Sequence, residues 1–301
     1  MGEVIALTGA TGYLGSHLLK AFCRAGHDVI VLKRSSSSIS RIATELLFCR
    51  YYDVDVVPVS EVFDQNSVTM IVHAACSYGR AGETAADIFN ANTYFPLRLL
   101  SAACNYQVPI FINVGTSLER DLNKYSISKS QFLDWGKHYS AVGDIKFVNV
   151  RLEHFFGPDD DLSKFISYLV DACSKTDVIN LTAGEQTRDF IFIDDVVRAF
   201  VKVIENIQFI DSGFFQFDLG QGESILVREM VELIHALTKS QARLNFGAIP
   251  YRNREVMYSK ADTSWLKSIG WSPLYSLARG LQATLDGWDE GAESIGTQKD
   301  D

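Results

Sequence analysis

A glycine-rich segment near the N-terminus constrains the fold of this chain more than any other feature. It reads Thr8-Gly9-Ala10-Thr11-Gly12-Tyr13-Leu14-Gly15-Ser16, after an apolar run and before an amphipathic stretch. Glycines at this spacing let the backbone turn sharply and approach a pyrophosphate, whose charge the free N–H groups and the helix dipole stabilise. The alternative is a glycine-rich turn without a ligand. The context favours a Rossmann-type dinucleotide-binding fold.

The first half of the chain alternates short apolar runs with stretches of helical length, as the βαβ units of a parallel sheet do. After Arg151 the loops become longer and richer in Gly, Asp and aromatic residues. The predicted class is α/β, a Rossmann doubly wound parallel sheet with a smaller interleaved α/β substrate-binding lobe. The expected strands are Val4–Thr8, Val29–Lys33, Met70–His73, Ile110–Val114 and Ile145–Val150, and the expected helices are Leu14–Ala25, Ile39–Phe48, Ala86–Asn105 and Ser126–Ser140.

The second half returns to the sheet domain before it completes the lobe. A strand and helix are predicted over Phe190–Ile204, with a buried strand at its start. Phe214, Phe215 and Phe217 alternate as in a strand, and we expect them to line the interface of the lobe. The expected division is a dinucleotide-binding domain at 1–151 plus about 189–212, a substrate-binding lobe at about 152–188 and 213–288, and a flexible tail at 289–301.

Composition excludes several classes of protein. Apolar residues make up 47% and charged residues 22%, which is typical of a globular chain and unlike a disordered one. The net charge of −9 disfavours a nucleic-acid or anionic-membrane surface. The five cysteines are scattered, with no C-x-x-C pair, and no apolar stretch approaches a membrane span or a leader. These features predict reduced thiols and a cytoplasmic protein.

The end of the second predicted strand bears on the choice of cofactor. An NAD-preferring fold would place an acidic residue there, to bond the ribose 2′-hydroxyl. This chain has Lys33 and Arg34 followed by serines, which would suit the 2′-phosphate of NADP. The alternative is a pair of solvated surface cations. Asp55 is placed to approach the adenine amino group, or else is an ordinary loop carboxylate.

A tyrosine and a lysine four residues apart form the candidate catalytic pair. Tyr125 and Lys129 would lie one turn apart on one face of a helix. A free Tyr titrates near pH ~10, and a neighbouring cation lowers the pKa of the phenol towards the range useful for proton exchange with an alcohol or carbonyl oxygen. The pair follows a strand that ends in Thr116-Ser117.

Together with His73-Ala74-Ala75 and Asn92, these motifs resemble the extended short-chain dehydrogenase/reductases, the NAD-dependent epimerase/dehydratase family that acts on nucleotide sugars. The resemblance covers nearly the whole chain. It implies that Tyr125 donates or accepts the proton, that Lys129 also holds the nicotinamide ribose, and that Thr116 bonds the reacting oxygen, with Ser117 in reserve. The implied cofactor is NADP, or NAD, held by Gly9, Thr11, Gly12, Tyr13, Leu14, Gly15, Lys33, Arg34, Asp55, Ala74, Ala75 and Lys129.

The second half most resembles family members that reduce a 4-keto nucleotide sugar with NADPH. The resemblance lies at 151–158, 184–195 and 246–255. It implies substrate contacts from Ser117, from His154, and from Arg188 and Arg252, which would meet the phosphates or the base. For Arg188 the alternative is a salt bridge to Asp189 or Asp194, and for His154 it is a packed loop histidine. Asp194 and Asp195 are interpreted as a helix start, and no metal is expected.

Three reactions share this scaffold. A 4,6-dehydratase has an Asp-Glu pair directly after the active-site Thr, and here Ser117-Leu118 follow Thr116 instead, which disfavours dehydration. The basic residues Lys33 and Arg34 favour a 4-ketoreductase of a nucleotide-linked 4-keto-6-deoxyhexose or 3,6-dideoxyhexose, in deoxysugar and O-antigen lipopolysaccharide synthesis, over an NAD-dependent 4-epimerase. A non-enzymatic Rossmann regulator is the remote alternative. The resemblance also implies a homodimer, joined through the helix of the Tyr/Lys pair and its predecessor.

Overall fold

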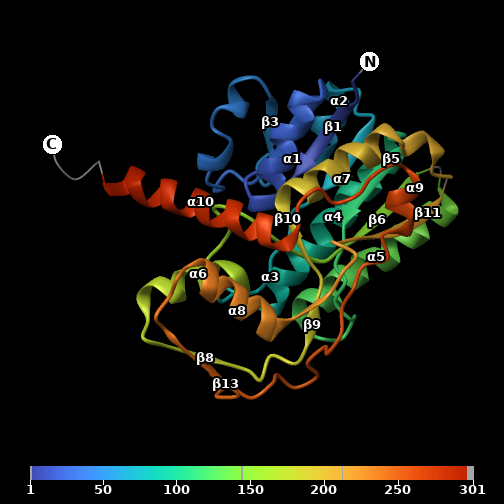
Figure 1. The fold of residues 1–301 in the computed structure, drawn as a ribbon. Helices are drawn as coiled ribbons and strands as arrows, with labels where there is room; N and C mark the ends of the chain where they lie inside the picture. Colours follow the sequence, from blue (N-terminus) through green and yellow to red (C-terminus); the bar gives the residue numbers. More distant parts are fainter. Residues whose placement is uncertain (1, 144, 212, 297–301) are drawn as a thin grey trace. The chain divides into compact units, whose positions relative to one another are not determined.

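The structure is a computed structural model that describes residues 2–143, 145–211 and 213–296. The chain divides into two compact units, and Figure 1 shows the elements of each. The first unit contains Met1–Leu152, Val197–Asp218 and Ser268–Gly270, and the second contains Glu153–Val196, Leu219–Lys267 and Trp271–Asp301.

A seven-stranded sheet forms the centre of the first unit. Its strand order is β3-β2-β1-β4-β5-β6-β11, and the pairings from β3 across to β6 are parallel. The strand order reverses between β1 and β4, the point where Rossmann folds bind their ligands. The strands are β1 (Val4–Thr8), β2 (Asp28–Lys33), β3 (Arg50–Asp53), β4 (Met70–His73), β5 (Ile110–Val114), β6 (Lys146–Leu152) and β11 (Phe214–Leu219).

Apolar side chains bury the sheet against its helices. Alternate strand residues such as Ala6, Ile71 and Phe111 join one continuous cluster with side chains of α2, α4 and α5. Helix α1 contacts β1 and β2 and buries Leu18 and Phe22 fully. The helical elements are α1 (Tyr13–Arg24), α2 (Val59–Gln65), α3 (Ala85–Phe89), the π-helical turn η3 (Asn90–Tyr94), α4 (Phe95–Asn105), α5 (Lys124–Val142) and α7 (Ile193–Glu205), with short 3₁₀ turns η1 (Ser40–Ile42), η2 (Glu45–Leu47) and η4 (Ile207–Phe209).

These observations confirm the predicted Rossmann class, and two predicted helices differ. The stretch expected as one helix at Ile39–Phe48 contains only η1 and η2, neither of which has a side-chain cap, and Leu47 and Phe48 face solvent. The helix expected over Ala86–Asn105 is divided at η3, where Asn92 turns its side chain inward. At the second place the contacts of buried Asn92 accompany the departure from helical periodicity.

The second unit is built from short strand pairs and four helices. Strand β7 pairs in parallel with β10, β8 in parallel with β13, and β9 in antiparallel with β12. Helices α6 and α8 pack against each other, and α10 packs against β10. The elements are β7 (His154–Phe156), α6 (Phe165–Lys175), β8 (Val178–Leu181), β9 (Thr187–Arg188), β10 (Phe190–Phe192), β12 (Ile225–Leu226), α8 (Val227–Leu237), β13 (Arg243–Phe246), α9 (Ser264–Ser268) and α10 (Leu277–Gly296).

Two segments fall in the opposite unit from the one expected. The buried strand Phe190–Phe192 pairs with β7 in the second unit and does not join the sheet of the first. Conversely, the aromatic run that starts at Phe214 forms β11, the edge strand beside β6, and Phe214 stacks on Phe147 with ring centroids 6.3 Å apart. Both runs are apolar enough to be buried in either place, so only the long-range pairing assigns them.

The C-terminal region is helical up to Gly296. Helix α10 includes the first part of the predicted flexible tail, and the remaining residues, 297–301, lie outside the described range. Among the residues that the structure describes, no helix is both long and apolar enough to cross a membrane.

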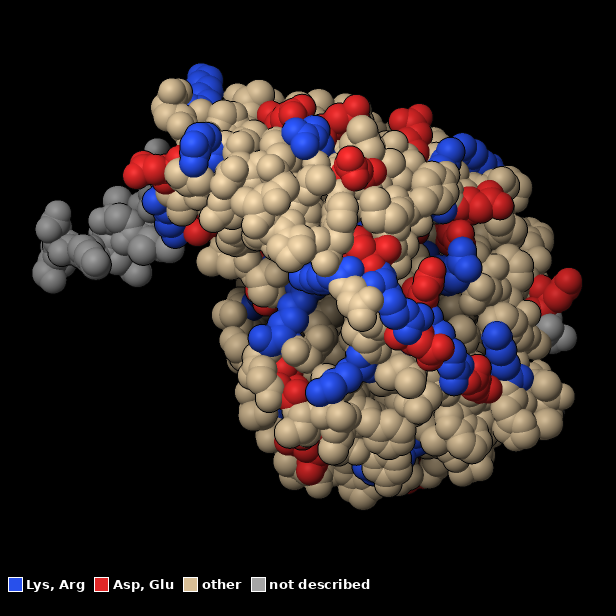
Figure 2. Space-filling view, turned by 90° about the horizontal axis from the view of Figure 1, so that it is seen from below, with Lys and Arg blue, Asp and Glu red and all other residues tan. Residues whose placement is uncertain are grey.

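Charged side chains of both signs are interspersed on the face shown in Figure 2. Ion pairs at the surface of the described residues include Arg120 with Asp134 and Lys175 with Asp171. Exposed pairs of this kind contribute little to stability, about 0–1 kcal/mol each.

Candidate active site

The glycine-rich loop joins β1 to α1 and packs tightly against the segment after β4. Gly9 has a φ of +75°, and its carbonyl accepts a 2.9 Å hydrogen bond from Gly12 N–H. A Cβ atom on Gly9 would lie 2.6 Å from the Ala75 nitrogen, and one on Gly15 would lie 2.0 Å from the Gly9 oxygen. Only glycine fits at these two positions, so the backbone can approach a ligand closely here.

This loop fits the diphosphate of a dinucleotide. Gly12 is the N-cap of α1 and has no side chain to satisfy the first N–H groups of the helix. Thr11 is half-buried at the edge of the loop, and Tyr13 and Leu14 are each 8% exposed in the first helical turn. The first N–H groups of the helix and the positive end of its dipole are therefore suited to an anionic ligand at this end.

The basic residues after β2 have partners in the structure. Lys33 forms an ion pair with Asp53 at the end of β3 and is largely buried. Arg34 is exposed. The Asp55 carboxylate accepts hydrogen bonds of 2.7 Å from both the N–H and the hydroxyl of Ser35, which lower the pKa of Asp55, and Arg34 adds to that lowering. Of the two cations, Arg34 is therefore the one turned to solvent, while the 2′-phosphate contact stays a prediction.

The candidate catalytic pair lies at the start of α5. Asn123 caps this helix through a capping box, in which Asn123 Oδ1 accepts from Ser126 N–H at 2.9 Å and Ser126 Oγ accepts from Asn123 N–H at 3.0 Å. Tyr125 therefore occupies a fixed first turn, half-buried, and Lys129 follows one turn later, 4% exposed. The helical spacing that the sequence predicted places both residues on the same face.

Thr116 meets Tyr125 from the neighbouring strand. It follows β5 by two residues, and its side chain lowers the pKa of Tyr125. The Thr116 hydroxyl also accepts a 3.3 Å hydrogen bond from Leu118 N–H. Ser117 donates its N–H to the Leu152 carbonyl at 3.3 Å. The geometry therefore brings Thr116, the residue assigned to the reacting oxygen, to the phenol.

The pKa of Tyr125 lies above its ordinary value, in contrast to the expected lowering. Burial is the main cause, and the charge of Cys76 adds to the rise, while the Thr116 hydrogen bond and Arg80 lower the pKa of Tyr125. Burial also lowers the pKa of Lys129. Desolvation disfavours the charged form of both groups and outweighs the attraction that helical spacing alone would predict. The phenol is therefore protonated at neutral pH.

Asn92 joins the loop after β4 to the catalytic helix. Its side chain is fully buried; Oδ1 accepts from Ser77 N–H at 2.7 Å, and Nδ2 donates to the Ser77 carbonyl at 2.8 Å and to Ser128 Oγ at 3.0 Å. Ser128 Oγ in turn donates to the Tyr125 carbonyl at 2.8 Å. The π-helical turn η3 thus has a structural role, because it brings this amide between the two segments.

His73, at the end of β4, contacts the end of β1 beside the glycine loop. It is fully buried, and its Nδ1 lies 2.8 Å from Thr8 Oγ1. Burial lowers the pKa of His73 well below its usual value, and the charge of Lys129 lowers it further. A neutral imidazole is therefore held beside Thr8, within electrostatic reach of Lys129.

In the second unit, the predicted substrate-binding arginines lie near one turn. Arg188 donates to Glu255 Oε1 at 2.6 Å, and Glu255 N–H donates to the Arg252 carbonyl at 3.1 Å. Burial lowers the pKa of Arg188, and the charges of Glu255 and Glu153 oppose that change. The alternative for Arg188 was a salt bridge to Asp189 or Asp194, and the observed ion-pair partner is Glu255. Arg252 is exposed.

His154 lies beside the buried carboxylate of Glu153. Its Nδ1 is 3.4 Å from Glu153 Oε2, and its ring packs edge-on against Phe190 with centroids 5.8 Å apart. Glu153 accepts 2.7 Å hydrogen bonds from Ser259 Oγ on both carboxylate oxygens. The side chain of His154 is 38% exposed, so it can both pack and meet a ligand.

Two buried acidic residues of the second unit, Asp189 and Asp195, bind backbone N–H groups of its loops. Asp189 is fully buried and accepts from the N–H groups of Gln221, Gly222 and Ala261 at 2.6, 2.9 and 3.1 Å. Asp195, in the first turn of α7, accepts from two backbone N–H groups at 274 and 275. The predicted helix start is observed, and Asp195 additionally orders a distant loop. Within the described residues, no group of three or more His, Cys, Asp or Glu is arranged to hold a metal ion.

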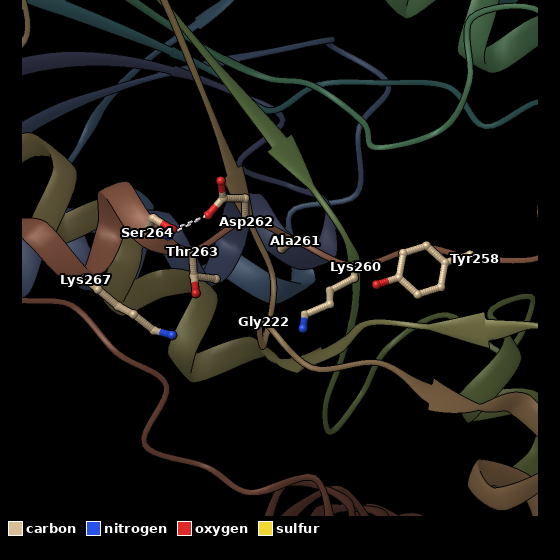
Figure 3. Close-up of a pocket in the computed structure, with 8 residues that line it drawn as sticks. All are labelled: Gly222, Tyr258, Lys260, Ala261, Asp262, Thr263, Ser264 and Lys267. Carbon is tan, nitrogen blue, oxygen red and sulfur yellow. Dashed lines mark hydrogen bonds between the residues drawn. The ribbon is translucent and has the colours of Figure 1, made fainter.

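A polar hollow of about 350 Å³ lies in the second unit, as Figure 3 shows. Asp262 Oδ1 accepts from Ser264 N–H at 2.9 Å at its edge. The residues singled out from the sequence lie elsewhere, so this hollow is separate from the predicted contacts. It is lined by Gly222, Tyr258, Lys260, Ala261, Asp262, Thr263, Ser264 and Lys267.

Sequence reasoning missed several residues around the predicted ones. Cys76 and Arg80 act electrostatically on Tyr125, and the ring of Tyr78 packs on it. Glu255 was noted only as part of a motif, although it is the ion-pair partner of Arg188. A signal was present for the first group, because Cys76 to Arg80 directly follow the His73-Ala74-Ala75 motif.

Comparison with known proteins agrees with this geometry. Residues 5–216 match the family described as "NAD dependent epimerase/dehydratase family". CDP-abequose synthase of Salmonella typhimurium is 32% identical over 297 residues, covering 94% of this chain and 97% of that protein. UDP-glucose 4-epimerase of Thermotoga maritima has a similar fold, with a TM-score of 0.83 at 21% identity over 96% of this chain and 99% of the other.

UDP-glucuronic acid 4-epimerase of Bacillus cereus, solved with UDP-glucuronic acid and NAD, also has a TM-score of 0.83, at 21% identity over 95% of this chain and 99% of the other. The glycine loop and the strand order are those of a dinucleotide-binding Rossmann enzyme. The match over residues 5–216 and the 32% identity over nearly the whole chain agree with them. The protein is therefore an enzyme of the NAD-dependent epimerase/dehydratase family, of the short-chain dehydrogenase/reductase type.

Proposed function

We propose that the protein is an NADPH-dependent 4-ketoreductase of a nucleotide-linked 4-keto-6-deoxyhexose or 4-keto-3,6-dideoxyhexose, CDP-abequose synthase-like or dTDP-fucose-forming. The observation that carries this proposal is the 32% identity to CDP-abequose synthase across 97% of that protein. The likeness to 4-epimerases, at 21% identity, concerns the fold alone. The proposed role lies in deoxysugar synthesis for a surface polysaccharide.

Tyr125 is suited to the proton transfer that a reduction needs. A reductase places a proton donor at the C4 oxygen, and a tyrosine hydroxyl can supply that proton. Reduction is preferred over epimerisation because of the 32% identity to CDP-abequose synthase.

In the proposed reaction, the reduced nicotinamide, when bound, supplies the hydride to the C4 carbonyl carbon. Tyr125 delivers its proton to the carbonyl oxygen as negative charge develops there, and the product is the C4 alcohol. Thr116 donates a hydrogen bond to the same oxygen and stabilises that charge. Lys129 holds the nicotinamide ribose, and its positive charge favours the phenolate that Tyr125 becomes.

The second unit would hold the nucleotide. Arg188 and Arg252 are proposed to meet the phosphates or the base, with Glu255 orienting the Arg188 guanidinium through the 2.6 Å ion pair. His154 and Ser117 are proposed to contact the sugar. The predicted cofactor contacts of Arg34, Asp55, Ala74 and Lys129 belong to the same proposal, with NADP as the cofactor.

The activity is tested by following NADPH consumption with CDP-linked and dTDP-linked 4-keto-6-deoxy sugars, with NMR analysis of the product. We expect turnover with at least one sugar and a new C4 alcohol. In Tyr125→Phe, turnover should be lost while NADPH binding is retained. Failure with the whole panel, together with interconversion of UDP-glucose and UDP-galactose, would identify a 4-epimerase instead.

A homodimer joined through α4 and α5 is also proposed. Ile127 and Trp135 on α5 are 39% and 44% exposed. Large apolar side chains left exposed on this helix favour burial against a second copy. Light scattering should report a dimer for the full chain and a monomer for Trp135→Glu. An equal mass for both proteins would contradict the proposed interface.

A further inference from the structure

The ring of Tyr78 packs on the ring of Tyr125. The two ring centroids are 5.0 Å apart and the ring planes are inclined by 30°. The guanidinium of Arg80 lies over the Tyr78 ring, 5.1 Å from its centroid. Tyr78 therefore contacts the candidate proton donor on one side and a cation from its own loop.

Hydrogen bonds of other residues hold the loop that carries Tyr78. Asn92 binds both the N–H and the carbonyl of Ser77, immediately before Tyr78. Beyond it, Glu83 accepts from Ser77 Oγ at 2.9 Å and from Ala81 N–H at 2.8 Å, which closes the loop on itself. The backbone is therefore held both before and after Tyr78 in the chain, although the Tyr78 side chain is 39% exposed.

The charged groups that act on Tyr125 lie in the loop after β4. Cys76 and Arg80 act with opposite sign: the first raises the pKa of Tyr125 and the second lowers it. Lys129 follows on α5, and its charge acts on buried His73. Tyr78 lies between Cys76 and Arg80 in the chain and meets Tyr125 through its ring.

We propose that Tyr78 is a positioning residue, whose ring holds the Tyr125 phenol in one orientation at the start of α5. Arg80 keeps the Tyr78 ring in place. The proposal rests on the proposed role of Tyr125 as proton donor. A displacement of about 1 Å at a reacting group can cost up to about 10²-fold in rate. A ring that limits the movement of the Tyr125 phenol therefore affects the rate of proton transfer.

The chain offers a matched control. Arg98 lies over the ring of Tyr94 at 5.9 Å in the same unit, and Tyr94 is 50% exposed. Tyr94→Ala and Arg98→Met therefore remove the same kind of pair from the same kind of surface. These variants report what a lost Arg-over-Tyr contact does at a distance from the Tyr78 pair.

The position of Tyr125 is measured without any substrate by ¹⁹F NMR of the full chain labelled with 3-fluorotyrosine. Its signal is identified by its absence in Tyr125→Phe. We expect Tyr78→Ala to shift and broaden this signal, and Tyr78→Phe and Tyr94→Ala to leave it near the wild-type position. An unchanged signal in Tyr78→Ala, or an equal shift in Tyr94→Ala, would overturn the proposal.

Kinetics then test the consequence for the reaction. Tyr78→Ala should lower kcat about 10-fold with KM changed less than about 2-fold, and Tyr78→Phe should restore most of kcat. A raised KM with unchanged kcat would overturn the proposal, because Tyr78 would then bind substrate. If the wild-type enzyme reduces no 4-keto sugar, the proposed function fails, and the NMR result still decides the role of Tyr78.

Discussion

Thr116, two residues beyond strand β5, acts on Tyr125 in the first turn of α5: its side chain lowers the pKa of the Tyr125 phenol, against the larger effect of burial. The influence runs from the end of a strand to the start of a helix, although nine residues of chain separate the two. A hydroxyl beside the phenol is also suited to stabilise negative charge on an oxygen bound there.

Replacing Thr116 should affect turnover more than binding. We expect Thr116→Val to lower kcat by roughly 10²-fold, the effect of losing one hydrogen-bond donor at a developing oxyanion, and Thr116→Ser to stay within a few-fold. Steady-state kinetics with NADPH and the reactive 4-keto sugar measure this. Ser117→Ala is the control, and a larger loss there than in Thr116→Val would transfer the role to Ser117.

Removing the buried amide of Asn92 should destabilise the first unit. Asn92→Ala leaves the Ser77 N–H and Ser128 Oγ without their partner, and each buried unsatisfied group costs about 1–3 kcal/mol. We expect the free energy of unfolding in urea to fall by about 2–4 kcal/mol, with a loss of kcat. Asn105→Ala, at the exposed end of α4, should change the free energy of unfolding by less than about 0.5 kcal/mol. Equal losses in the two variants would contradict this role.

Asp189 should make stability depend on pH in an unusual direction. Burial raises the pKa of Asp189 to about 6, although three backbone N–H groups partly oppose that rise. Because the folded pKa lies above the unfolded value of 3.8, the folded state binds the proton more readily. The contribution of this group to stability is therefore fully present below about pH 4 and is lost as the pH rises through about 6.

The comparison of wild type with Asp189→Asn isolates this effect. As the pH falls from 7 to 4, the wild-type free energy of unfolding should rise relative to the variant by up to about 3 kcal/mol. Urea titrations at several pH values measure it. Asp171→Asn, which removes a surface pair with Lys175, should show a flat difference. A flat difference for Asp189→Asn as well would contradict the raised pKa.

Arg34 should distinguish NADPH from NADH. Arg34 is exposed after β2, while Lys33 is paired with Asp53. Removing the Arg34 side chain should therefore weaken the binding of NADPH more than the binding of NADH. We expect Arg34→Ala to raise the Kd of NADPH about 10-fold, or about 1.4 kcal/mol, and to leave that of NADH nearly unchanged. Fluorescence titration measures both constants, with Arg24→Ala at the exposed end of α1 as the control. An equal rise in the Kd of both cofactors would show that Arg34 does not bind the 2′-phosphate.

Some features of this protein follow from local sequence alone. The glycine loop, the order of strands and helices in the first half, and the placement of Tyr125 and Lys129 on one helical face depend on periodicity and on short spacings. Such patterns act within one or two turns of the chain, where backbone geometry leaves few alternatives. Residue order by itself therefore identifies the glycine loop and the Tyr/Lys pair.

Other features depend on groups far apart in sequence, which only the tertiary structure brings together. Glu255 pairs with Arg188 from 67 residues away, and the aromatic run at Phe214 is assigned to the first unit only by its pairing with β6. The pKa of Tyr125 is a further example. The helical spacing predicts that Lys129 lowers the pKa of Tyr125, whereas burial raises it. Burial and long-range pairing are properties of the packed chain, and a local pattern carries no measure of how much solvent each group loses.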